Sequence, residues 1–80
     1  MRIDKYLKNS RIIKRRTLAH EACSQERVFV NGKTAKPGTD VKEGDEIHIL
    51  FGNGEMKVRV LSTPDHVTKE MAPTLYEIIG

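Results

Sequence analysis

The sequence predicts an α+β domain in which two N-terminal helices pack on a small, mainly antiparallel sheet. Apolar residues recur at helical spacing as far as residue 25, and at the period-two spacing of strands from residue 28 onward. Asn31-Gly32 lies between two short strand-like runs, and this dipeptide favours the positive φ angles of a tight hairpin turn. The sequence therefore places the helices first and the sheet after them.

Two helices are expected, over residues 2–9 and from about Arg15 to Gln25. Each has a stripe of apolar residues that can face a core. The stripes consist of Ile3, Tyr6 and Leu7 in the first helix, and of Leu18, Ala19, Ala22 and Cys23 in the second. Ile12 and Ile13 are expected to lie between the helices as the hinge of the pair.

Four strands and a folded tail are expected after the helices. The strands cover residues 28–30, 33–35, 46–51 and 56–61, and Gly-containing turns separate them. In the last strand Met56, Val58 and Val60 alternate with the charged Lys57 and Arg59, which predicts one buried and one exposed face. The tail is too apolar to be disordered. We therefore expect a domain over residues 1–62 and a tail, residues 63–80, packed on it.

The net charge of +3 conceals a strong asymmetry along the chain. Residues 1–36 carry ten Lys and Arg against three acids, a net +7, whereas residues 37–80 carry four against eight, a net −4. A segregated positive charge indicates that one surface meets a polyanion. The alternative is a solvated basic surface that has no partner.

Composition argues against an enzyme, a metal protein and a membrane protein. The single cysteine, Cys23, cannot form an internal disulfide, which favours a reducing, cytoplasmic location. No apolar run approaches the ~20 residues that span a bilayer. His20, His48 and His66 lack metal-ligand spacing, and no nucleophile with a base and an orienting group can be assembled. We expect a monomer with no catalytic residues, no metal and no cofactor.

Four motifs in order resemble the S4-type RNA-binding domain, also called the αL motif. They are Arg2-x-Asp4-Lys5-x-Leu7, Arg11-x-x-Lys14-x-Arg16-Thr17-x-Ala19, Val28-x-Val30-Asn31-Gly32 and Val41-x-x-Gly44-Asp45-x-Ile47. The N-terminal residues and the tail sequence Leu75-Tyr76-Glu77-Ile78-Ile79 are similar to stand-alone members of bacterial ribosome-associated quality control, the RqcP/YabO type. This resemblance implies binding to rRNA and peptidyl-tRNA on stalled large ribosomal subunits. It also implies a protein partner that adds C-terminal alanine tails to the nascent chain.

The sequence departs from the family pattern at two positions. Members usually have Gly directly after the second helix, where a left-handed residue ends it, and this chain has Glu26. Ser or Thr is common where Arg15 stands, so the start of the second helix is in doubt. Neither departure removes a basic residue.

The candidate RNA-binding residues surround the junction of the two predicted helices. They are Arg2, Lys5, Arg11, Lys14, Arg15 and Arg16. Arginine binds a phosphate through two parallel hydrogen bonds, and lysine acts as a point charge. Asp4 is predicted to orient a neighbouring arginine. An alternative for Arg16 is a surface ion pair with Asp4 or Glu21, and Lys33 and Lys36 either extend the basic surface or keep an edge strand soluble.

Two other functions remain open. A heat-shock-type S4 factor would rescue peptidyl-tRNA on free large subunits, but those relatives carry a basic C-terminal extension. Residues 62–80 here contain one basic residue and three acids, which favours the quality-control factor. A DNA-binding helix-turn-helix regulator is the alternative from another class, although its charge would lie along a recognition helix.

Overall fold

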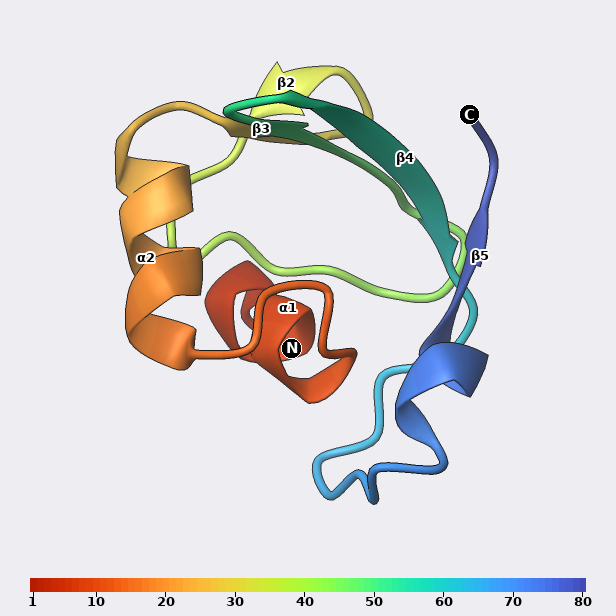
Figure 1. Cartoon of the computed structure of the whole chain (residues 1–80). Coiled ribbons are helices and arrows are strands. Elements are labelled where there is room, and N and C mark those ends of the chain that lie inside the picture. The colour runs from red at the N-terminus through yellow and green to blue at the C-terminus, as the bar shows by residue number, and fades with distance from the viewer.

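A curved antiparallel sheet arches over the first helix in the computed structural model, which describes all 80 residues (Figure 1). The elements are α1 (Ile3–Asn9), α2 (Arg16–Ser24), β1 (Val28–Val30), β2 (Lys33–Thr34), β3 (Glu46–Phe51), β4 (Gly54–Val60), a 3₁₀ turn η1 (Ala72–Leu75) and β5 (Tyr76–Ile78). The strand order is β2-β1-β3-β4-β5, and every neighbouring pair is antiparallel. The predicted α+β fold class is confirmed. Neither helix has the length and apolar composition that crossing a membrane requires.

The core lies between the sheet and α1. In β4 the side chains of Val58 and Val60 are buried and Lys57 is exposed, so the predicted alternation is confirmed. Ile47 and Ile49 of β3 lie on the same buried face, with Ile47 opposite Val58. Burying this apolar face against the helices supplies most of the stabilisation available to so small a domain.

The tail forms a fifth strand, which the sequence analysis did not predict. The sequence predicted only that the tail packs on the domain. In the structure Tyr76 pairs with Val60 and Ile78 with Val58, at the free edge of β4. In Figure 1 the tail passes below α1 and then returns beside β4. Unlike residues 28–30, Tyr76–Ile78 have no hairpin turn signal such as Asn-Gly beside them. Pairing with β4, and not local propensity, determines their conformation.

The boundaries of four other elements differ slightly from the predicted ones. The first helix begins at residue 3 and not 2, and the second covers 16–24, because Arg15 is extended (φ −127°, ψ 137°) and precedes the first helical residue. The second hairpin strand ends at residue 34, one residue early, and β4 begins at 54 and ends at 60. Terminal residues of this kind are set by pairing and capping, which local sequence patterns resolve poorly.

A buried hydrogen bond joins α1 to the tail. The hydroxyl of Tyr6 donates to the carbonyl oxygen of Leu75 at 2.6 Å, and neither side chain is more than 1% exposed. The same carbonyl accepts from the backbone N–H groups of Leu61 and Ser62. Burial raises the pKa of Tyr6, so the phenol stays protonated and remains a donor throughout the physiological range.

Glu26 forms a left-handed cap at the end of α2. Its φ is +59°, its N–H donates to Cys23 O, and the N–H of Arg27 donates to Ala22 O, both at 3.0 Å. These are the two bonds of a Schellman motif. A side chain in this conformation costs about 1 kcal/mol relative to glycine. The cap is therefore retained and strained.

The Asn-Gly turn is fastened to the turn before β3. Asn31 and Gly32 have φ of +51° and +84°, as the predicted hairpin requires. The Asn31 side chain donates to the buried carboxylate of Asp45 at 3.1 Å and accepts from Glu46 N at 2.9 Å. This network holds the hairpin in register with the rest of the sheet.

Replacing the strained cap residue tests this description. Glu26→Gly should raise the free energy of unfolding by about 1 kcal/mol, which is a Tm increase of about 4–8 °C in a domain of this size. Urea and thermal denaturation measure both quantities. Glu26→Ala removes the same charge but keeps Cβ, so it should give no comparable gain; an equal gain would assign the effect to charge.

Tyr6→Phe should lower the free energy of unfolding by about 0.5–1.5 kcal/mol, because one buried hydrogen bond is lost while Leu75 O keeps two donors. Tyr76→Phe is the matched control, since the hydroxyl of Tyr76 makes no hydrogen bond within the chain. Equal destabilisation in the two variants, measured by urea denaturation, would contradict the role given to the Tyr6 hydroxyl.

Candidate nucleic-acid interface

A buried carboxylate holds two arginines at the junction of the helices. Asp4 is 2% exposed, and its oxygens lie 3.1 Å from Nη2 of Arg2 and 3.6 Å from Nη2 of Arg16. The backbone N–H of Lys5 donates to the same carboxylate at 2.7 Å. We call Arg2, Asp4 and Arg16 the Asp4 cluster. It joins the residue before α1 to the first residue of α2.

The two guanidinium groups remain available on their outer sides. The side chains of Arg2 and Arg16 are 53% and 49% exposed. They line an open pocket of about 370 Å³ together with Asp4, Thr17 and His20. No side chain caps the start of α2, so the first-turn N–H groups near Arg16 and Thr17 are free to bind an external acceptor. With one carboxylate between two arginines, the cluster has a net charge of +1.

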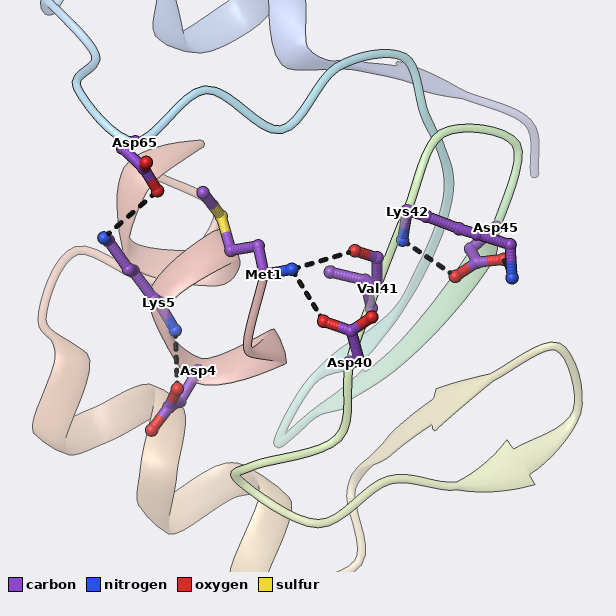
Figure 2. Close-up of polar contacts among 8 residues, drawn as sticks. All are labelled: Met1, Asp4, Lys5, Asp40, Val41, Lys42, Asp45 and Asp65. Atoms are coloured by element: carbon purple, nitrogen blue, oxygen red, sulfur yellow. Dashed lines mark hydrogen bonds and ion pairs between the residues drawn. The ribbon is translucent and has the colours of Figure 1, made fainter.

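Lys5 is turned away from the Asp4 cluster. Figure 2 shows its side chain extending to Asp65 of the tail, where Nζ lies 3.5 Å from Oδ1. The figure also shows the N-terminal amine of Met1 bound to Asp40 and to Val41 O, at 2.7 and 3.3 Å. These contacts tie the start of α1 to the tail on one side and to the segment before β3 on the other.

The linker between the helices exposes a second group of cations. Ile12 and Ile13 pack against the core, while the flanking Arg11 and Lys14 are exposed and have no acidic partner. Arg11 has a φ of +60° and ends α1 by donating its N–H to Lys8 O at 3.0 Å. A pocket of about 230 Å³ forms there, the cationic pocket, lined by Lys8, Asn9, Arg11, Lys14 and Val67.

The predicted residues therefore divide into separate groups. Arg2, Asp4 and Arg16 meet in the Asp4 cluster, and Arg11 and Lys14 meet in the cationic pocket. Lys5 contacts the tail, and Arg15 is exposed at the N-cap of α2 without an ion pair. Thr17 and His20, which line the pocket beside the Asp4 cluster, were not predicted from the sequence.

Lys8, Asn9 and Val67 of the cationic pocket were not predicted either. The regular three-residue spacing of Lys8, Arg11 and Lys14 could have identified Lys8 as part of this basic group. Nothing in the sequence places Val67 there, because the contact is between distant segments.

Several charged groups on the outer face of the sheet are paired, although Lys57 is exposed without an ion pair. Arg59 contacts both Glu46 and Glu77, and His48 lies 2.9 Å from Glu55. On the helical side a run of neighbouring basic residues is exposed without ion pairs: Lys8, Arg11, Lys14 and Arg15. This difference favours the helices as the surface that meets a polyanion.

Cys23 and the histidines offer no catalytic arrangement. Burial, with a smaller contribution from the charge of Asp4, raises the pKa of Cys23 to about 11, so the thiol stays neutral and a poor nucleophile at neutral pH. No three His, Cys, Asp or Glu side chains are placed to hold a metal ion.

Comparisons with known proteins identify close relatives. The family described as S4 domain matches residues 1–47. The chain is 56% identical over 78 residues to the RQC P-site tRNA stabilizing factor of Halalkalibacterium halodurans, covering 98% of this chain and 89% of that protein. The protein of the same name from Streptococcus pneumoniae is 53% identical over 80 residues, covering 100% and 91%. A solved structure of trimeric heat shock protein 15 from Vibrio cholerae matches with a TM-score of 0.91 at 30% identity, covering 99% of this chain and 81% of that one.

Removing the charge at the centre of the Asp4 cluster should loosen both arginines. Asp4→Asn keeps the shape of the side chain and should lower the free energy of unfolding by about 1 kcal/mol, since the half-exposed arginines recover part of the loss from water. NMR relaxation of the arginine Nε–H groups should show greater mobility in Arg2 and Arg16. Asp65→Asn, at the exposed partner of Lys5, should leave both signals unchanged; a mobility gain there, or none in Asp4→Asn, would contradict the assignment.

Proposed function

Because the chain belongs to the S4 domain family, we propose that it binds rRNA and peptidyl-tRNA on stalled large ribosomal subunits as a factor of ribosome-associated quality control. It acts by binding and performs no chemistry. Its relatives from Halalkalibacterium halodurans and Streptococcus pneumoniae are named for stabilising a P-site tRNA, and their similarity extends over nearly the whole chain.

The observation that carries this proposal is the Asp4 cluster beside the start of α2. Two arginines fixed on one carboxylate present their planar groups to solvent in a set orientation. Fixed arginines suit structured RNA, which proteins recognise by shape, phosphate contact and stacking on guanidinium planes. The free N–H groups at the start of α2 add further phosphate donors.

The finer steps of the function belong to the same proposal. Bound near the tRNA, the protein supports a partner that adds C-terminal alanine residues to the stalled chain. It works in the cytoplasm as a monomer, without cofactor. The outer sheet face offers the partner a surface separate from the RNA, since its charges lie on the side away from the Asp4 cluster.

A heat-shock-type factor that rescues peptidyl-tRNA on free large subunits is the second candidate. The match to heat shock protein 15 supports it, because the whole fold including the tail is shared. The tail itself favours quality control. Its acid Asp65 already binds Lys5, whereas a basic extension would add to RNA binding.

Arg16→Ala should weaken binding to purified large subunits by about 1–3 kcal/mol, roughly 5- to 150-fold, because it removes an oriented guanidinium from the interface. Cosedimentation with subunits that carry peptidyl-tRNA measures the affinity. Free subunits in parallel distinguish the two candidates, since the quality-control factor should prefer the loaded particles.

Arg59→Ala is the matched control, because Arg59 is also half-exposed and ion-paired but lies on the sheet. It should bind as the wild type does. Equal affinity of Arg16→Ala and wild type would overturn the proposal. Stronger competition by duplex DNA than by structured RNA would indicate the helix-turn-helix regulator instead.

A further inference from the structure

We infer that the cationic pocket is a phosphate-binding site for the RNA backbone, distinct from the Asp4 cluster, and that it supplies the salt-dependent part of the affinity. The inference rests on the proposed function and goes beyond it. It assigns Lys8 to RNA binding together with Arg11 and Lys14, and it makes Val67 of the tail one wall of the site.

The cations of the pocket have no neutralising groups. None of Lys8, Arg11 and Lys14 forms an ion pair, although all three border one pocket of about 230 Å³. Asp65, the acid that the tail brings to α1, binds Lys5 instead. Like charges held together without a counter-charge repel each other, so the free protein gains from an anion at this place. A phosphodiester is the anion that RNA provides.

The backbone fixes the positions of these cations. Arg11 is held at φ +60° by the end of α1, and Ile13 N donates to Leu7 O at 3.1 Å. The two isoleucines between Arg11 and Lys14 pack inward, which leaves both basic side chains on the outside. A side chain in the left-handed region is strained, and such strain gathers at functional positions.

The tail completes the pocket. Val67 packs on the core, and the side chain of Asn9 donates to the carbonyl of Asp65 at 3.5 Å. The tail thus closes one side of the pocket, and the Asn9 amide adds a neutral polar group to the lining. An open row of surface lysines would lack such a wall.

The two sites should contribute differently to binding. In the Asp4 cluster both arginines are already paired with Asp4 in the free protein. A phosphate that binds them therefore competes with a carboxylate, and the contact mainly orients the protein on the RNA. The basic residues of the cationic pocket have no ion pair in the free protein, so their binding to phosphates displaces counterions from the RNA. Each phosphate neutralised in this way adds about 0.7–0.9 to the slope of log affinity against log salt.

The test compares salt slopes on purified large subunits. Binding of Lys8→Gln, Arg11→Gln and Lys14→Gln is measured from 50 to 200 mM KCl. Each variant should reduce the slope by about 0.7–0.9, so that the wild type loses about 2.6- to 3.5-fold more affinity than the variant across this range. Circular dichroism confirms folding, which is expected because all three side chains are exposed.

Lys57→Gln is the matched control, since Lys57 is exposed and unpaired but lies on the outer sheet face. It should leave the slope unchanged. Asp4→Asn removes no cation, so it should not reduce the slope. Unchanged slopes for the three pocket variants, in a protein that does bind subunits, would overturn the inference and leave the proposed function standing.

A second measurement distinguishes failure of the phosphate site from failure of the proposed function. Amide NMR shifts of the full chain are followed during titration with oligouridylate and, in parallel, with inorganic phosphate. Shifts at Lys8, Arg11, Lys14 and Val67 with both probes support a phosphate site even if the wild type fails to bind ribosomal subunits. Shifts confined to the Asp4 cluster, or absent at Lys8, would contradict it.

Discussion

The burial of α1 is the constraint on which the rest of the structure depends. A helix of seven residues is unstable by itself, and this one is stabilised by contacts on several sides. Ile3, Tyr6 and Leu7 are fully buried. Backbone carbonyls of the segment 37–41 accept hydrogen bonds from the first N–H groups of the helix, and the tail accepts one from the Tyr6 hydroxyl. Of the residues of α1, only Lys5, Lys8 and Asn9 reach solvent. The packing that makes the helix possible thus also decides which of its charges face outward.

The same burial explains how a carboxylate can organise a basic surface. Asp4 lies on the inner side of α1, where an unpaired charge would be costly, so it needs Arg2, Arg16 and the Lys5 N–H. The arginines are exposed enough to bind a partner and anchored enough to keep one orientation. The contacts that neutralise the buried Asp4 carboxylate are thus the same contacts that orient Arg2 and Arg16.

Local patterns predicted much of this protein. The fold class, the Asn31 hairpin and the alternation in β4 follow from periodicity and turn chemistry, which act within a few residues. The motif resemblance to the S4 domain is confirmed by the family match. Lys5 pairing with Asp65 and Val67 lining a pocket depend on contacts across about sixty residues of chain, for which a single sequence has no local signal. The division of residues 1–62 from 63–80 stays a prediction, as do the roles of the individual basic residues.

Glu26 shows where a departure from family pattern was informative. Its side chain stands in a left-handed cap that glycine would fill without strain, and the cap bonds are kept. Sequence could locate the anomaly, but only the backbone angles decide between an altered cap and a strained one.

The bond from Tyr6 to Leu75 has a consequence for how the chain tolerates change. It links the buried side of α1 to the residue that precedes β5, so that local opening of the tail would break this hydrogen bond and expose Tyr6. A substitution near residue 75 would then reduce the fraction of molecules able to bind, and the apparent dissociation constant would rise in inverse proportion to that fraction. Selection on RNA affinity would in this way constrain tail residues that never touch RNA.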